Sequence, residues 1–274
     1  MPYNELNELR DLAHSFLLEV DRPVDTQLIA RHLFGPQRHE MPEAQVVVRS
    51  LMESDPRFLR THCRRWSARW APHLQQDLAR AAFAVVDLET TGSVIGVDEI
   101  MEIGLVRLEK GRIHQRFTTR LRTSRDIPPW VSRLTGLSDR DLAGAPTLEE
   151  TGAQISELLA GAIFVAHDIR FDMPFLRWEL TQRDHAFPCE TGLCTLQLSR
   201  GLWPDLPSHS LGELAASLGL DHHNPHRAGD DALAAAGVLL QALEAARGLG
   251  RRTLGELMEL DLAAAPGARQ SAES

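Results

Sequence analysis

The sequence lacks the features of membrane and secreted proteins. No apolar run is long enough to span a bilayer, and the N-terminus has neither a basic start nor an apolar stretch. These absences argue against a membrane protein and predict a cytoplasmic one. Cysteine is also scarce, and its spacing is not that of a structural zinc site. We therefore expect Cys63, Cys189 and Cys194 to be reduced thiols.

Positive charge is limited as well. The net charge is −9, and Lys110 is the only lysine among 29 basic residues, which we attribute to a compositional bias toward arginine. Such a chain is not expected to coat nucleic acid along its whole surface, because phosphates repel it. A nucleic-acid enzyme is not excluded, since divalent cations bound to a carboxylate-rich site reverse the local field. The hydrophobic content of 43% is that of an ordinary globular protein with a core.

Residues 1–80 have the outline of a winged helix-turn-helix domain. Apolar residues at helical spacing predict three helices, and a hairpin of two short strands follows them. We expect the helices over residues 6–20, 26–33 and 43–52 and the strands over 57–60 and 65–70. Asp25 is expected to cap the second helix, which Gly35 ends. Between residues 57 and 80 there are six arginines and one acid, a composition suited to phosphate contacts.

Residues 81–246 alternate strand and helix patterns, which predicts an α/β domain with a mainly parallel sheet. The continuous apolar run at 81–88 indicates a strand buried on both faces. Further strands are expected over 100–108, 112–121 and 162–166, the first two as a hairpin, and helices over 148–159, 171–183, 210–218 and 230–246. Residues 247–274 should form a short helix over 253–262 and then a disordered tail, because the tail lacks apolar residues to pack.

Two carboxylates follow the first buried strand. Asp87 and Glu89 are one residue apart, so strand alternation places both side chains on the same side. They repel each other unless a cation neutralises them, and hard oxygen ligands suit Mg²⁺ or Mn²⁺. The alternative is a pair of solvated loop acids, which the apolar strand before them and the Thr-Thr-Gly turn after them disfavour.

A third carboxylate follows the strand at 162–166. Asp172 lies in the first turn of the next predicted helix, where the helix dipole keeps an acid ionised, as a metal ligand must be. A simple helix-capping acid explains the same position equally well.

The last motif is a loop histidine followed by an acid at a helix start. His226 can accept a proton from water near neutral pH, and Asp231 begins the alanine-rich helix. Adjacent helix residues point about 100° apart, so only one of Asp230 and Asp231 can face a metal. We interpret the nearby His222 and His223 as surface histidines without a role.

In this order and at these separations, the three motifs resemble the DEDDh branch of the ribonuclease H-like 3′→5′ exonucleases. The greatest similarity is to the epsilon-type proofreading exonuclease of bacterial DNA polymerase III. The resemblance covers residues 81–246, and it includes matches outside the three motifs. These matches are residues 99–104, 134–139, 145–147, 194–200 and 208–211.

The resemblance implies a ribonuclease H-like fold, in which helices flank a mixed central sheet, and a role for each motif residue. Asp87 would bridge two divalent ions, Mg²⁺ or Mn²⁺. Glu89 and Asp231 would complete the more tightly held ion, and Asp172 would hold the second ion or its water. His226 would be the general base that deprotonates the attacking water. The product would be a nucleoside 5′-monophosphate, and the resemblance selects Asp231 over its neighbour by its spacing from the histidine.

The resemblance also implies contacts to the terminal nucleotide of a nucleic acid with a free 3′ end. The implied substrate-binding residues are Thr90, Thr91, Gly92, His167 and Phe171. One departure lies beside them, because the family's usual asparagine after the histidine is Asp168 here. An amide can donate a hydrogen bond, whereas an ionised aspartate only accepts. We expect Asp168 to be tied to a neighbouring backbone donor or to Arg170.

Three functions stay open at this point. The leading one is 3′→5′ degradation of single-stranded or frayed DNA, in proofreading or repair; the chain has no room for a polymerase domain, so proofreading would need a polymerase in trans. The second is the same reaction on RNA or oligoribonucleotides. Contacts to the 2′-hydroxyl would distinguish this substrate from DNA. The third is DNA or partner docking through residues 1–80. The alternative, that these residues merely pack against the catalytic domain, stays open, because eleven arginines balance eleven acids there.

Overall fold

The structure is a computed structural model, and the chain divides into two compact units. The residues that it describes are 3–36, 42–61 and 64–263. The units are Met1–Asp77 with Thr253–Gly255, and Leu78–Arg252 with Glu256–Ser274. Cys63 and the tail predicted to be disordered, apart from Ala263, lie outside the described residues. Within the described part of the chain, no helix is both long and apolar enough to cross a membrane.

The first unit contains the three helices and the hairpin that the sequence predicts. They are α1 (Tyr3–Val20), α2 (Thr26–Phe34), α3 (Pro42–Glu53), β1 (Phe58–Arg60) and β2 (Trp66–Ala68), followed by a 3-10 helix, η1 (Pro72–Gln75). Asp25 caps α2 by accepting a hydrogen bond from the Leu28 backbone at 2.7 Å, and Gly35 ends the helix at a φ of +82°. Val24 forms an antiparallel bridge to Trp66, which is buried in the core of this unit. The likeness to a winged helix stays a prediction.

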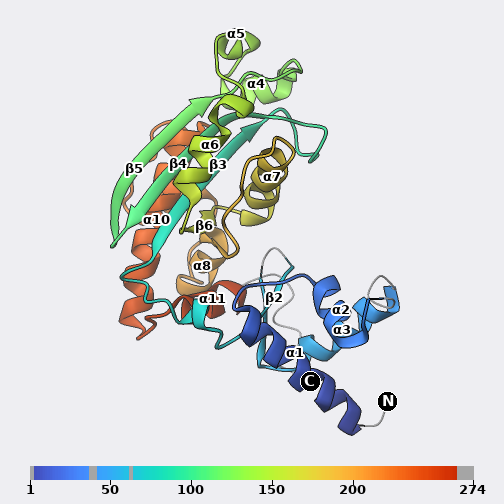
Figure 1. Ribbon diagram of the computed structural model, residues 1–274. Helices are drawn as coiled ribbons and strands as arrows, with labels where there is room; N and C mark the ends of the chain where they lie inside the picture. The colour runs from blue at the N-terminus through green and yellow to red at the C-terminus, as the bar shows by residue number, and fades with distance from the viewer. Residues whose placement is uncertain (1–2, 37–41, 62–63, 264–274) are drawn as a thin grey trace. The chain divides into compact units, whose positions relative to one another are not determined.

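The second unit is built on a five-stranded sheet in the order β5-β4-β3-β6-β7 (Figure 1). Its strands are β3 (Ala82–Thr90), β4 (Ile100–Glu109), β5 (Arg112–Arg120), β6 (Ile163–Ala166) and β7 (Gly192–Cys194). β4 pairs antiparallel with both β3 and β5, whereas β6 pairs parallel with β3 and β7 pairs parallel with β6. The expectation of a mainly parallel sheet is therefore wrong, because the β4–β5 hairpin makes the sheet mixed. The mixed sheet that the family resemblance implies is confirmed.

Helices connect and cover these strands. They are α4 (Pro129–Thr135), α5 (Asp139–Leu142), α6 (Leu148–Leu159), α7 (Ile169–Thr181), α8 (Thr195–Leu202), α9 (Leu211–Ser217) and α10 (Ala228–Gly248), and α11 (Leu254–Ala263) follows them. The helices predicted from periodicity are confirmed with small shifts of their ends. α4, α5, α8 and strand β7 were not predicted; each is short, with eight residues or fewer.

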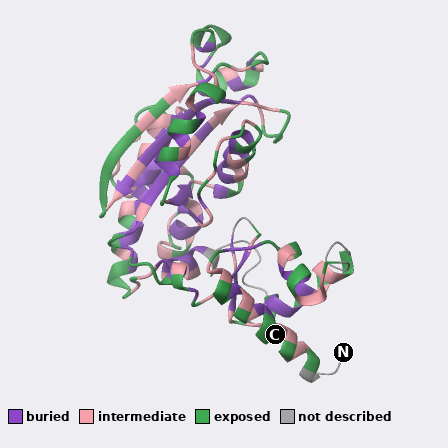
Figure 2. Cartoon of the chain, in the orientation of Figure 1, coloured by how far each residue is buried: buried purple, intermediate pink, exposed green. Residues whose placement is uncertain are grey.

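Helices lie on both faces of the sheet. On β4, Gly104 faces the start of α10, whereas the Arg107 guanidinium donates a hydrogen bond to the Leu158 carbonyl of α6 at 2.7 Å. Residues three apart on a strand point to opposite faces, so α10 and α6 cover opposite sides. Figure 2 shows buried residues concentrated on β3 and β4 and exposed residues along the edge strand β5. The two buried central strands form a rigid base for the residues at their ends.

Candidate active site

Strand β3 places the first two carboxylates. Its residues from Phe83 to Val86 are buried, and the strand pairs with β4 along its length. Asp87 lies opposite Gly104 and Glu89 lies opposite Glu102, so both acids point to the same face, as predicted. Continuous backbone pairing thus fixes the separation of these two side chains.

A glycine opposite Asp87 brings the third element of the site close. A Cβ at Gly104 would collide with the carbonyl oxygen of Ala228, the first residue of α10. Only glycine therefore permits the helix to start so near the sheet. The close approach carries the first turn of α10, with Asp231, toward the carboxylates of β3.

Asp172 completes the group of acids from α7. It lies in the first turn of that helix, as predicted, with only 5% of its surface exposed. Burial raises the pKa of Asp87 well above its usual value, and the negative charges of Asp172, Asp231 and Glu89 raise it further. Burial likewise raises the pKa of Asp172, although hydrogen bonds from backbone groups oppose the shift. The four carboxylates therefore share one poorly solvated space.

Glu89 shows the same crowding. Burial raises its pKa to about 7, and the charges of Asp231 and Glu102 add to the shift, while Arg227 opposes it. A carboxyl group with a pKa this high lies in surroundings that disfavour its ionised form. A cation bound among these oxygens would remove that penalty.

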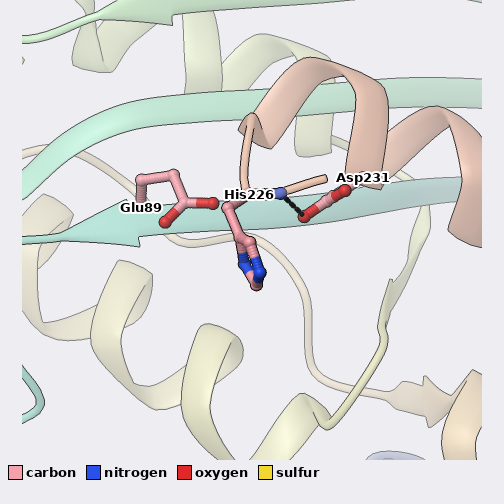
Figure 3. Close-up of side chains that lie close together, drawn as sticks. All are labelled: Glu89, His226 and Asp231. Carbon is pink, nitrogen blue, oxygen red and sulfur yellow. Dashed lines mark hydrogen bonds between the residues drawn. The ribbon is translucent and has the colours of Figure 1, made fainter. Parts of the chain in front are cut away.

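His226 lies beside two of the carboxylates. Ligand atoms of Glu89, His226 and Asp231 all lie within 4.8 Å of one another, and Figure 3 shows the two acids on either side of the histidine. The His226 backbone N–H donates to Oδ2 of Asp231 at 3.0 Å. The histidine is exposed and has a φ of +64°, a region that residues other than glycine seldom occupy.

The structure distinguishes the two adjacent aspartates of α10. The Asn224 side chain donates to Oδ2 of Asp230 at 2.7 Å, so Asp230 is bound to the preceding loop. Asp231 is buried and lies with Glu89 and His226. The geometry thus brings together the five residues proposed from the sequence: Asp87, Glu89, Asp172, His226 and Asp231.

The interpretation of His222 as a surface histidine is wrong. Its side chain is 9% exposed, and its Nε2 lies 2.5 Å from Oδ1 of Asp231. His223, by contrast, is exposed, as expected. No local signal separates these neighbours, because the loop fold alone decides which ring turns inward.

Sequence reasoning also missed the role of Glu102 in holding the loop. This residue of β4 is 1% exposed and accepts hydrogen bonds from the Arg227 guanidinium at 2.5 and 3.1 Å. Its Oε2 also accepts from the backbone N–H of Ala228 at 3.0 Å. The pair ties the residue after His226 to the sheet. An acid inside the otherwise apolar segment 100–106 could have marked Glu102 as unusual, although it does not identify Arg227 as its partner.

The turn after β3 is tightly held. Thr91 is buried, its backbone N–H donates to the Glu99 carbonyl at 2.9 Å, and its hydroxyl accepts from the Glu99 N–H at 3.0 Å. The Thr90 hydroxyl donates to the Gly92 carbonyl at 2.5 Å, and a Cβ on Gly92 would collide with Asp98. Thr90, Thr91 and Gly92 thus lie on a turn that hydrogen bonds within the protein hold in place. The substrate contacts expected of them stay predictions.

His167 is held at both ring nitrogens. Nδ1 lies 3.0 Å from the Thr195 hydroxyl, and Nε2 donates to the His209 carbonyl at 3.0 Å. Burial lowers its pKa to about 4, so the ring is neutral near pH 7. The substrate contact by His167 stays a prediction, and within the protein this ring joins three segments of the chain.

Asp168 is tied to Arg170, one of the two partners expected for it. The guanidinium donates to both carboxylate oxygens, at 2.7 and 2.9 Å, and lowers the pKa of the aspartate. The residue has a φ of +79° at the start of α7, which aspartate and asparagine tolerate better than most residues. Phe171, predicted to shape the nucleotide pocket, is partly exposed, and its ring centroid lies 5.5 Å from that of Phe175.

Comparison with known proteins gives one family match and several relatives. The RNase_T family, described as Exonuclease, matches residues 84–239. The 3′-5′ exonuclease DinG of Bacillus subtilis (strain 168) is 38% identical over 180 residues, which are 65% of this chain and 19% of the relative. The protein of the same name from Staphylococcus saprophyticus is 33% identical over 183 residues, 67% of this chain and 20% of the relative. The chain thus spans about a fifth of the length of these relatives.

Solved structures share the fold. E. coli Exonuclease I in complex with a dT13 oligonucleotide has a TM-score of 0.56 and 17% identity, over 62% of this chain and 43% of that one. Exonuclease X in complex with 5′ overhanging duplex DNA has a TM-score of 0.51 and 24% identity, over 65% and 99%. The nuclease domain of 3′hExo, a DEDDh family member bound to rAMP, has a TM-score of 0.53 and 18% identity, over 65% and 98%.

Proposed function

The chain belongs to the RNase_T exonuclease family, among its DEDDh-type 3′→5′ members, and from this membership we propose that it removes nucleotides stepwise from the 3′ end of nucleic acid. One observation carries the proposal. Three separate segments bring four carboxylates and a histidine into one small space at the end of β3. The groups are Asp87, Glu89, Asp172, His226 and Asp231.

Divalent cations fit this group of residues. Carboxylates that burial and mutual repulsion disfavour become favourable when a cation neutralises them, and Mg²⁺ and Mn²⁺ prefer oxygen donors. Two ions are proposed: Asp87, Glu89 and Asp231 would hold one of them, and Asp172 would hold the second with Asp87. When bound, such a pair stabilises the charge on the entering and leaving oxygens of a displacement at phosphorus.

His226 is the proposed general base. Its ring lies beside Glu89 and Asp231, and its exposure lets it accept a proton from water and pass it to solvent. The oxygen of that water forms a bond to the phosphorus of the terminal linkage. The bond from phosphorus to the 3′-oxygen of the preceding nucleotide breaks, and that oxygen takes up a proton from solvent. The products are a nucleoside 5′-monophosphate and a shortened strand with a 3′-hydroxyl.

Single-stranded or frayed DNA is the proposed substrate. Exonuclease I and Exonuclease X, which share the fold, are known in complexes with DNA, whereas 3′hExo is known with rAMP. RNA is therefore the alternative for the same site. Rates on DNA and RNA oligonucleotides of one sequence, measured side by side, distinguish them, and a faster rate on RNA would assign the alternative.

Product analysis tests the proposed reaction. A 5′-labelled single-stranded oligonucleotide, incubated with the purified protein and Mn²⁺ or Mg²⁺, should shorten by single nucleotides. Nucleoside 5′-monophosphates should accumulate, and EDTA should stop the reaction. Release of the label as a mononucleotide at early times would show 5′→3′ degradation and contradict the proposal.

Proofreading or repair is the proposed biological use, in which a polymerase would act in trans. Such a role requires faster removal of a mispaired than of a paired 3′ nucleotide from the same primer–template, and equal rates would argue for general end trimming.

Docking through residues 1–80 remains a separate prediction. In that unit Arg57 pairs with Asp55 and with Asp11, each at 2.7 Å, so this arginine is engaged within the protein.

A further inference from the structure

The loop between α9 and α10 contains two adjacent histidines in opposite environments. His222 has 9% of its side chain exposed, whereas His223 lies on the surface. The His222 ring also lies next to Gly212 of α9, where an added Cβ would come within 3.6 Å of Nδ1. The first ring is thus packed in one orientation, and its neighbour provides an internal comparison.

The packed ring is aimed at Asp231. Nε2 of His222 donates to Oδ1 of the carboxylate at 2.5 Å, because an ionised carboxylate only accepts. The other oxygen, Oδ2, accepts from the His226 backbone N–H at 3.0 Å. Each oxygen has two acceptor sites, so each retains one for a cation. These two hydrogen bonds orient the Asp231 carboxylate.

The same bonds close the loop around the proposed general base. His226 lies between His222 and Asp231 in the chain, and its left-handed backbone, with φ +64°, is held against its own preference. The Glu102–Arg227 pair holds the loop from the side of the sheet. The His222 bond connects the middle of this loop to the carboxylate of Asp231.

We propose that His222 is a positioning residue, which orients the carboxylate of Asp231 for a divalent cation by donating from Nε2 to Oδ1. Loss of a hydrogen-bond partner of a metal ligand commonly weakens metal affinity by about 10–100-fold. The inference rests on the proposed function in one respect only, the assignment of Asp231 as a metal ligand.

Metal binding without nucleic acid tests this role. Mn²⁺ affinity of the full-length, metal-stripped protein is measured by electron paramagnetic resonance of the free ion. His222→Ala and His222→Leu should weaken binding by about tenfold or more. His222→Gln, whose amide can donate to Asp231, should keep most of the affinity. His223→Ala is the matched control and should bind as the wild type does.

Each outcome bears on the proposal. Equal affinity in the wild type, His222→Leu and His222→Gln would overturn it. So would an equal loss in His222→Leu and His222→Gln, because ring packing and not the hydrogen bond would then be the cause. Thermal unfolding in EDTA identifies any variant that fails to fold. If His222→Ala is such a variant, the comparison of His222→Leu with His222→Gln decides.

Nuclease assays on the same proteins separate this inference from the proposed function. A wild-type protein that binds Mn²⁺ but degrades no nucleic acid would overturn the function, while the affinity differences would still support the role of His222. If the enzyme is active and the variants bind Mn²⁺ as tightly as wild type, the function stands and the positioning role fails.

Discussion

The two halves of the candidate site are held in place by different means. Asp87 and Glu89 lie on a nine-residue strand that is hydrogen-bonded to β4 on one side and to β6 on the other. His226 and Asp231 lie on a loop and a helix start, where a few side-chain hydrogen bonds set the geometry. The strand half depends on many backbone contacts, and the loop half depends on individual residues.

The two halves also carry different energetic costs. In the strand half the cost is electrostatic, because burial and neighbouring charges raise the pKa of Asp87 and bring that of Glu89 to about 7. In the loop half the cost is conformational, since His226 occupies the left-handed region at φ +64°. In the strand half, a paired backbone holds charges together that disfavour one another. In the loop half, individual hydrogen bonds hold a residue in a strained conformation.

Replacing Asp87 should have the largest effect, because it removes the carboxylate at the centre of the strand half. Asp87→Asn should lower kcat by at least about 10⁴-fold, beyond the contribution of a general base alone. The same change removes a buried charge that its neighbours disfavour, so the metal-free protein should unfold at a higher temperature. Single-turnover rates and thermal unfolding in EDTA measure the two effects. Wild-type activity in this variant would remove Asp87 from the site.

Substitution of His226 breaks the loop half at its strained residue. His226→Gly should lower kcat by about 10²–10⁴-fold, as expected for loss of a general base, and the deficit should shrink as pH rises. Stability should not fall, because glycine adopts a φ of +64° readily. Denaturant unfolding and a pH–rate profile provide the measurements. A constant deficit at every pH would contradict the role of His226 as base.

The pH dependence of stability sharpens the electrostatic side of the comparison. The pKa of Glu89, raised by burial and then by Asp231 and Glu102, is about 7 against an ordinary 4.5. The folded state therefore favours protonated Glu89, and this stabilisation, complete below the ordinary value, is lost as pH rises to about 7. In EDTA we expect the free energy of unfolding to fall by about 1–3 kcal/mol across this window relative to Glu89→Gln.

Chemical denaturation at a series of pH values, with wild type and Glu89→Gln in parallel, measures that difference. Saturating Mn²⁺ should reverse the trend, since ions favour the charged form. Identical pH profiles for the two proteins would show that Glu89 is not held in a disfavoured environment.

The smallest effect is expected at Asp168, outside both halves. Its pairing with Arg170 is partly exposed, and such ion pairs contribute about 0–1 kcal/mol. Asp168→Asn restores the residue usual in the family and keeps a side chain suited to φ +79°. Stability should change by less than about 1 kcal/mol, and kcat/KM by less than about fivefold. A larger change in KM for nucleic acid would show that residue 168 contacts the substrate.

Local patterns explain what could be predicted. The side-by-side placement of Asp87 and Glu89 follows from strand alternation, and the position of Asp172 follows from a helix start; both depend on a few consecutive residues. The family resemblance correctly anticipated the mixed sheet. The three-residue strand β7 was missed, because it exists only through its pairing with β6.

The sequence by itself determined the strand, the helix starts and the residue types from which the site is assembled. Only the tertiary structure decided that His222 turns inward while His223 stays outside, and that Glu102 binds Arg227 across 125 positions of the chain. Neither outcome can be read from a local pattern, because each depends on how closely α10 approaches the sheet at Gly104. That approach is a packing contact between distant segments, and it exists only in the folded chain.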